Sequence, residues 1–194
     1  MKSKPILIVA GEPNSIFLEI FFKSLKKIKN KSPIILICSK KLFLLQSKYF
    51  NAQINFRLIS LDDVLKKRYN HKVINLLDVN LNVKKPFNKI TNMSNNYIEK
   101  CFNIALELLK KRISNKLING PISKKHFLKS KYLGITEYLA KKTNTKNYAM
   151  LIYNEKLSVS PITTHLPIRQ ISKKIKYKEI IKKIFLINNF IKKT

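Results

Sequence analysis

The chain has 194 residues, a formal net charge of +30 and an apolar share of 45%. The apolar share and the eleven phenylalanines exclude an intrinsically disordered chain, because such chains lack the apolar surface whose burial offsets conformational entropy. A chain of this length buries one sizeable core, or one core plus a smaller lobe. The sequence therefore predicts a folded protein of one or two domains.

Lysine supplies almost all of the positive charge. Of the 40 basic residues only four are arginines: Arg57, Arg68, Arg112 and Arg169. Specific nucleic-acid recognition relies on the planar guanidinium group of arginine, and the lysines here are spread over the whole chain. The composition disfavours a nucleic-acid partner, although a basic module that binds phosphate groups or nucleic acid without catalysis stays as an alternative. A field of this sign attracts phosphorylated small molecules.

The apolar run near the amino terminus, Ile6–Ala10, is too short for a signal peptide or a membrane span. We therefore expect a cytoplasmic protein without a membrane partner. Cys38 and Cys101 lie in a predicted strand and a predicted helix, without a CxxC motif or zinc-like spacing. They are interpreted as two buried thiols.

Predicted strands and helices alternate in the first part of the chain. Pro5–Ala10 is typical of a short buried strand, and the residues 15–28 have helical spacing after Asn14 or Ser15 as a cap. The further predicted elements are strands at Ile34–Cys38, Ile54–Ile59 and Val73–Leu77 and a helix at Leu42–Tyr49. This alternation predicts an α/β fold with a mostly parallel sheet and flanking helices.

A long amphipathic helix is predicted from Ser94 to Ile113, because apolar residues recur at steps of three or four. A short strand follows at Lys116–Asn119 and ends at Gly120-Pro121. The remaining predicted elements are a helix at Thr136–Thr143, a hairpin of Tyr148–Tyr153 with Leu157–Thr163, and helix from Ile168 to the end.

The usual dinucleotide and nucleotide motifs are missing. A Rossmann fingerprint needs three closely spaced glycines after the first strand, and the chain has only Gly11, Gly120 and Gly134. The sequence also lacks a Walker loop, an HExxH motif and a CxxC pair. An ordinary Rossmann nucleotide site is therefore excluded.

Three short segments combine turn residues with polar side chains. They are Ala10-Gly11-Glu12-Pro13, then Asn119-Gly120-Pro121-Ile122-Ser123-Lys124 with Gly134-Ile135-Thr136-Glu137, and finally Thr163-Thr164-His165-Leu166-Pro167. The last one is expected at the carboxyl end of a strand. Taken alone, the segment Ala10-Gly11-Glu12-Pro13 is typical of an ordinary turn after a strand. His71 and His126 match no motif and are interpreted as surface or packing residues.

In order and spacing these segments resemble the 4-hydroxythreonine-4-phosphate dehydrogenase family of vitamin B6 (pyridoxal phosphate) biosynthesis. That family has a Gly-Glu-Pro or Gly-Asp-Pro turn, a Gly-Pro-x-x-Lys turn, a Gly-His-Thr-Glu segment and a Thr-Thr-His-Leu-Pro segment in the same order. The resemblance covers about Ile6 to Ile175. It implies an isopropylmalate/isocitrate dehydrogenase-like α/β fold, with a first lobe at residues 1–125 and the start of an incomplete second lobe at residues 126–194.

The resemblance also implies an activity and a site. The family oxidises its phosphorylated hydroxy amino acid substrate, 4-phosphohydroxy-L-threonine, with NAD or NADP and a divalent metal (Zn, Mg or Co), and the β-keto acid then loses carbon dioxide. It makes His165 one ligand of that metal and Thr136 a contact to the substrate. A homodimer is implied, because family sites resemble ones shared across a dimer. No catalytic proton-transfer residue and no cofactor-binding residue is assigned.

Three departures from the family pattern are evident. Ile135 occupies the position of the family histidine before the threonine, so one polar substrate contact is lost. The glycine-rich continuation of the first turn is replaced by Asn14-Ser15-Ile16-Phe17-Leu18. Family members are longer, and two further metal histidines lie in the part without a counterpart here, whereas a catalytic zinc normally takes about three protein ligands.

These departures leave several alternatives open. One is a truncated product that is inactive alone, which we favour, and another is a chain that works with a partner polypeptide. The change at Ile135 also leaves open a dehydrogenase for another phosphorylated hydroxy acid, such as a threonate phosphate.

Overall fold

The computed structural model describes residues 3–27, 32–129 and 131–192. The chain divides into two compact units, which we call the sheet unit (residues 1–129) and the helical unit (residues 130–194). Each unit is described by itself. Among the described residues, no helix is both long enough and apolar enough to cross a membrane.

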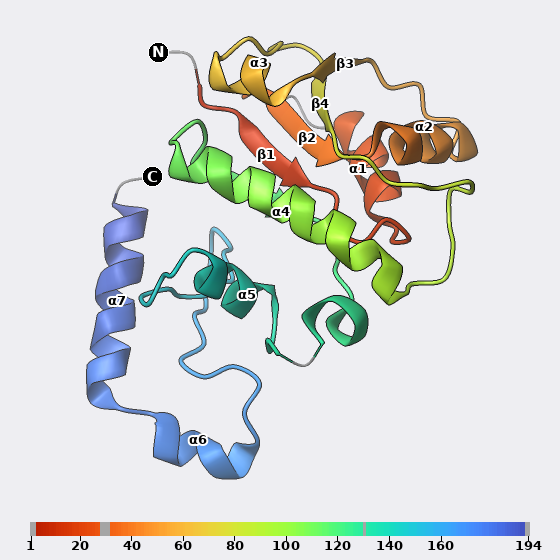
Figure 1. Cartoon of the computed structure of the whole chain (residues 1–194). Coiled ribbons are helices and arrows are strands. Elements are labelled where there is room, and N and C mark those ends of the chain that lie inside the picture. Colours follow the sequence, from red (N-terminus) through yellow and green to blue (C-terminus); the bar gives the residue numbers. More distant parts are fainter. Residues whose placement is uncertain (1–2, 28–31, 130, 193–194) are drawn as a thin grey trace. The chain divides into compact units, whose positions relative to one another are not determined.

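The sheet unit is built on five parallel strands (Figure 1). Their order across the sheet is β3-β4-β2-β1-β5, and every neighbouring pair is parallel. The strands are β1 (Ile6–Val9), β2 (Ile34–Cys38), β3 (Phe56–Ile59), β4 (Ile74–Asp78) and β5 (Lys116–Asn119). The predicted mostly parallel sheet is therefore confirmed.

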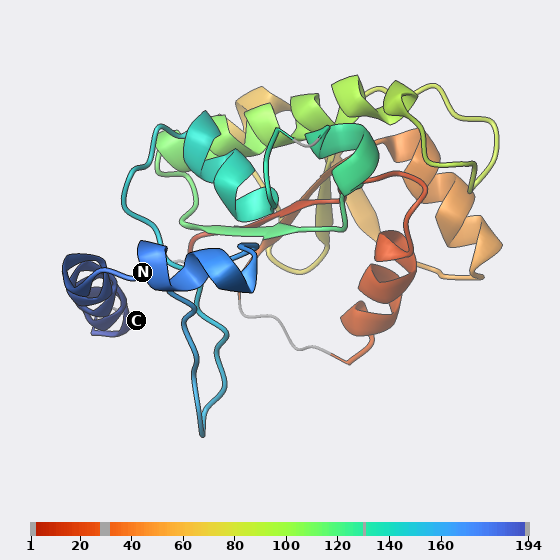
Figure 2. The same ribbon diagram turned by 90° about the horizontal axis from the view of Figure 1, so that it is seen from below.

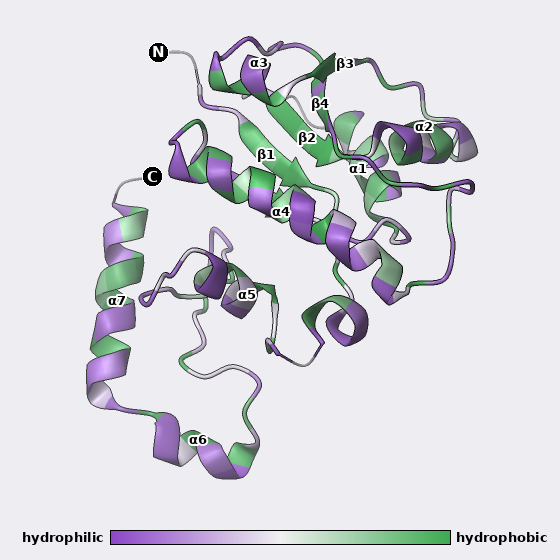
Figure 3. Ribbon diagram, viewed as in Figure 1, coloured by the Kyte–Doolittle hydropathy of each residue, from purple (hydrophilic) through white to green (hydrophobic). Residues whose placement is uncertain are grey.

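Helices cover both faces of this sheet. The helices α1 (Phe17–Leu25) and α2 (Lys40–Tyr49) pack on one face, where Ile8, Leu36 and Leu76 enter the same buried cluster as their phenylalanines. Figure 2 shows α4 (Asn95–Lys110) on the opposite face from α1. Because successive side chains of a strand point to opposite faces, strands buried on both sides are apolar throughout, as Figure 3 shows for β1 and β2.

Helix boundaries follow local capping chemistry. The Ser39 side chain accepts a hydrogen bond from the backbone N–H of Leu42 at 3.3 Å and begins α2. The helix α3 (Leu61–Leu65), which the sequence analysis missed, begins with a capping box of Ser60 and Asp63. Hydrogen bonds from Ser60 lower the pKa of the Asp63 carboxyl to about 2. The helices α1 and α4 lie within their predicted ranges, and the predicted end of α1 at Ile28 falls outside the described residues.

Both cysteines are buried in the sheet unit. Burial raises the pKa of the Cys38 thiol well above its ordinary value, with smaller contributions from Cys101 and Asp78, and burial raises the pKa of Cys101 to about 12. The neighbouring Tyr97 hydroxyl accepts a hydrogen bond from the backbone N–H of Ser39 at 3.0 Å. The thiolate is the reactive form, and a raised pKa keeps both thiols protonated at neutral pH, so both are unreactive there.

The helical unit contains α5 (Ile135–Lys142), α6 (Ile168–Lys174) and α7 (Tyr177–Ile191). The predicted hairpin is reduced to one antiparallel bridge, in which Ile152 and Val159 exchange backbone hydrogen bonds of 2.8 and 2.9 Å. The two full strands predicted there are therefore wrong for the described residues. Both bridge residues are exposed, and an isolated two-stranded pairing is only marginally stable. The predicted carboxyl-terminal helix is split into α6 and α7, and its end lies outside the described residues.

Candidate functional site

Two of the three segments noted in the sequence meet at the carboxyl edge of the sheet. Gly11 follows β1 and Gly120 follows the neighbouring strand β5. The backbone N–H of Glu12 donates a hydrogen bond to the Pro121 carbonyl at 2.8 Å. A Cβ on Gly120 would stand 2.1 Å from the Ala10 carbonyl oxygen, so only glycine allows the two turns to approach this closely. Ligands of open α/β sheets bind at this edge, where the chain connections diverge.

The first turn is fixed by a buried polar network. Glu12 is only 3% exposed, and its Oε1 accepts hydrogen bonds from the backbone and side chain of Asn14 and from the Ser94 hydroxyl, at 3.1 to 3.3 Å. The fully buried Gln46 amide donates to the carbonyls of Pro13 at 2.9 Å and Pro86 at 2.7 Å. These contacts tie the long connection between β4 and α4 to the turn after β1.

The later part of the second segment (Gly134–Glu137) and the third segment meet in the helical unit. Gly134 precedes α5, and Thr136 is the second residue of that helix and half-buried. The Nε2 atom of His165 lies 3.8 Å from the point where a Cβ on Gly134 would stand. Thus the two residues predicted for the site, separated by 29 positions in the numbering, belong to segments that pack together.

His165 differs from its expected setting in one respect. We predicted it at the carboxyl end of a strand, whereas it lies in an irregular segment, because the described residues before it form only the isolated bridge. The His165 side chain is exposed, and its backbone has a φ of 59°, in the left-handed region that few residues other than glycine adopt. An outlier of this kind requires surrounding contacts that hold it in place.

Glu137 was part of the predicted motif but received no role from the sequence. It lies in the first turn of α5, where a carboxylate also favours the positive end of the helix dipole. Its Oε1 accepts a long hydrogen bond of 3.5 Å from the Thr164 hydroxyl. The sequence did offer one signal for this arrangement. Glu137 follows the helix-capping residue Gly134 by three positions, and a glutamate at that position often turns back toward the start of the helix.

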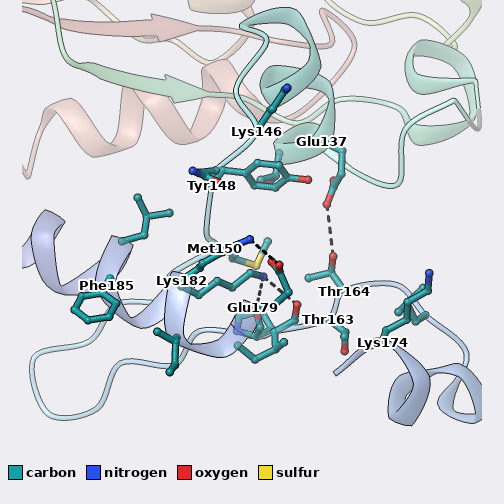
Figure 4. A pocket seen from close by; sticks show the side chains of 18 residues that line it. Glu137, Lys146, Tyr148, Met150, Thr163, Thr164, Lys174, Glu179, Lys182 and Phe185 are labelled. Atoms are coloured by element: carbon teal, nitrogen blue, oxygen red, sulfur yellow. Dashed lines mark hydrogen bonds and ion pairs between the residues drawn. The ribbon is translucent and has the colours of Figure 1, made fainter. Parts of the chain in front are cut away.

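A hollow of about 680 Å³ opens beside these segments in the helical unit (Figure 4). Thr136, Glu137, Thr163 and Thr164 contribute to its wall. Its charged residues are Lys146, Lys174, Lys182 and Lys183 against Glu137 and Glu179. Because the lysines outnumber the carboxylates, the lining suits an anionic ligand such as a phosphate ester.

The metal site that the resemblance implies is incomplete in the part of the chain that the structure describes. Among the residues that the structure describes, no group of three or more His, Cys, Asp and Glu side chains is placed to hold an ion. A catalytic zinc site normally has about three protein ligands. The role of His165 as a metal ligand therefore stays a prediction.

The remaining histidines lie in the sheet unit. His126 lies in the short π-helical turn η2 (Lys124–Leu128), with its Nδ1 3.2 Å from the side-chain oxygen of Asn92. His71 is exposed and its ring packs against Tyr69, with centroids 5.9 Å apart. The interpretation of these two residues as surface or packing residues is consistent with their positions.

Comparison with known proteins agrees with the resemblance. A family model described as "Pyridoxal phosphate biosynthetic protein PdxA" matches residues 29–194. A 4-hydroxythreonine-4-phosphate dehydrogenase from Sulfurihydrogenibium sp. (strain YO3AOP1) is 33% identical over 187 residues, which cover 94% of this chain and 56% of that protein. A D-threonate 4-phosphate dehydrogenase from Salmonella typhimurium is 28% identical over 176 residues, covering 88% of this chain and 53% of that protein.

The solved structure of 4-hydroxythreonine-4-phosphate dehydrogenase from Klebsiella pneumoniae superimposes with a TM-score of 0.82 at 26% identity, covering 98% of this chain and 59% of that one. The expected isopropylmalate/isocitrate dehydrogenase-like fold is thereby confirmed. The chain spans little more than half the length of the relatives that it matches. Since the family model matches well over half of the residues, this chain belongs to the PdxA family of pyridoxal phosphate biosynthetic proteins.

Proposed function

We propose that the chain carries part of the site of an NAD- or NADP-dependent dehydrogenase that acts on a phosphorylated hydroxy acid, with 4-phosphohydroxy-L-threonine as the first candidate. The observation that supports this most is the packing of the His165 segment against the turn that begins α5, beside a hollow with a cationic lining. The curated relative named 4-hydroxythreonine-4-phosphate dehydrogenase supports the choice of substrate.

In the proposed reaction the substrate's alcohol carbon gives a hydride to the nicotinamide ring, and the hydroxyl group releases its proton. The resulting β-keto acid then breaks its bond to the carboxylate and releases carbon dioxide. A divalent metal, when bound, stabilises the negative charge that develops on the substrate oxygen. We assign His165 as one ligand of such a metal, with the remaining ligands outside the described residues.

Thr136 is proposed as a contact to the substrate phosphate. Its position in the first turn of α5 places a hydroxyl beside backbone N–H groups that have no acceptor within the helix. Such a helix start binds anions, because the free N–H groups and the helix dipole both favour negative charge. The neighbouring lysines of the hollow would raise the local concentration of a phosphorylated ligand.

Binding and turnover test this proposal separately. Titration of the isotope-labelled chain with 4-phosphohydroxy-L-threonine should shift the amide signals of Thr136 and of the hollow, and Thr136→Val should weaken the binding. Unphosphorylated hydroxythreonine is the ligand control. We expect no metal-dependent reduction of NAD or NADP by this chain alone, because its described residues include no group of three or more side chains placed to hold an ion. Absence of any shift at Thr136 with the phosphorylated ligand would contradict the proposed site.

A second candidate substrate is D-threonate 4-phosphate. The relative of that name favours it, and Ile135, which removes a polar contact next to Thr136, leaves it open. Parallel titrations with the two phosphorylated compounds decide between them. Both compounds should shift the same amide signals, and the true substrate should do so at a lower concentration.

We propose a homodimer as the working assembly of the complete site. Analytical ultracentrifugation of the purified chain tests this proposal.

A further inference from the structure

Glu137 lies between the two segments of the proposed site in the helical unit. One carboxylate oxygen, Oε1, receives the Thr164 hydroxyl at 3.5 Å, and Figure 4 shows the two side chains pointing toward each other. The other oxygen, Oε2, lies 3.1 Å from the point where a Cβ on Gly134 would stand. The same side chain therefore reaches both Thr164 and the start of α5.

The imidazole of His165 approaches the same point. Its Nε2 atom lies 3.8 Å from the Cβ position of Gly134, so Nε2 and Oε2 of Glu137 can be no farther apart than the sum of the two distances. Any residue with a Cβ at position 134 would press against the carboxylate, because 3.1 Å is shorter than an ordinary contact. The missing side chain of Gly134 thus provides the space in which the carboxylate and the imidazole lie near each other.

The backbone of His165 needs such support. A left-handed conformation at a residue other than glycine costs free energy and persists only where neighbouring contacts enforce it. Thr164 is the residue directly before His165, and the hydrogen bond to Glu137 restrains it. His165 lies in an irregular segment, so the hydrogen bonds of a helix or strand do not hold its backbone in place.

We propose that Glu137 is a positioning residue for His165. Its carboxylate holds Thr164, and through Thr164 it keeps the imidazole over Gly134 at the start of α5. The use of His165 in catalysis rests on the proposed function, whereas its positioning by Glu137 does not, so the two are tested separately.

Nuclear Overhauser contacts in the metal-free chain test the positioning. The chain has three histidines, so the His165 ring signals are assigned by their loss in His165→Ala. Wild type should show contacts between the His165 ring protons and the Gly134 α protons. Glu137→Ala and Thr164→Val should each abolish them, because each removes one partner of the hydrogen bond. Glu137→Gln should retain them, because its amide oxygen still accepts from Thr164.

Glu179→Gln is the matched control. Glu179 lines the same hollow but pairs with Lys182 at 3.0 Å, so its replacement removes the same charge without touching Thr164. The control should leave the ring contacts intact. Three results would each overturn the inference. The ring contacts could survive in Glu137→Ala and Thr164→Val, they could be absent from wild type, or they could vanish equally in Glu179→Gln. Unchanged amide signals of the sheet unit serve as the check that the variants are folded.

Discussion

Replacement of Gly120 by alanine should destabilise the sheet unit strongly. The new Cβ would lie 2.1 Å from the Ala10 carbonyl oxygen, 2.8 Å from its carbonyl carbon and 2.7 Å from Cγ of Phe17. Two of these atoms belong to the backbone directly after β1, an internal strand that cannot retreat without weakening its pairing with β2 and β5. Overpacking of a core costs about 1–3 kcal/mol, and this geometry places the loss near the upper end, at roughly 3 kcal/mol.

Urea unfolding followed by circular dichroism measures this loss. With a dependence of about 2 kcal/mol per molar urea, a loss of roughly 3 kcal/mol lowers the midpoint by about 1.5 M. Gly134→Ala is the control, because its Cβ would meet only side-chain ends, Oε2 of Glu137 at 3.1 Å and Nε2 of His165 at 3.8 Å, and no backbone atom. A Gly120→Ala variant as stable as Gly134→Ala would refute the argument that the two turns need a glycine to approach each other.

Three further predictions concern Gln46, Cys101 and Ile135. Gln46→Leu leaves the carbonyls of Pro13 and Pro86 without their amide donor, so the free energy of unfolding in urea should fall by about 1–3 kcal/mol; an unchanged value would contradict the bridging role. Because burial raises the pKa of Cys101 from 9.0 to about 12, its contribution to stability is complete below pH 9 and is lost as the pH rises toward 12. Urea midpoints of wild type should therefore fall more steeply above pH 9 than those of Cys101→Ala, and parallel curves would count against burial as the cause. Ile135→His restores the family's polar contact, so it should tighten binding of 4-phosphohydroxy-L-threonine in calorimetric titrations, and equal or weaker binding would show that this position does not face the ligand.

The sheet unit was predictable from the sequence because its burial pattern is strong. Strands such as Ile34–Cys38 are apolar at every position, and α4 has apolar residues at helical spacing over four turns. The helix α3 was missed because its five residues are too few for the apolar positions Leu61, Val64 and Leu65 to establish a helical repeat. The capping pair Ser60 and Asp63 was the clearer signal of a helix start.

The site was predictable only as far as a motif could identify it. Thr136 and His165 were singled out from the resemblance, and their segments pack together in the helical unit. The left-handed backbone of His165 and the role proposed for Glu137 depend on contacts between residues far apart in sequence. No local pattern predicts such contacts, because they arise when Gly134 leaves open the space that both side chains approach.

The strand order has a consequence for how the chain reaches its native state. β1 precedes the other four strands of the sheet in the chain, yet it lies between β2 and β5, and its Ile6 pairs with Lys116. Pairing residues so distant along the chain requires closure of a very large loop, which slows folding. During translation one edge of β1 can pair with β2 early. The backbone hydrogen-bonding groups on its other edge stay unpaired until β5, more than a hundred residues later in the chain, has emerged from the ribosome.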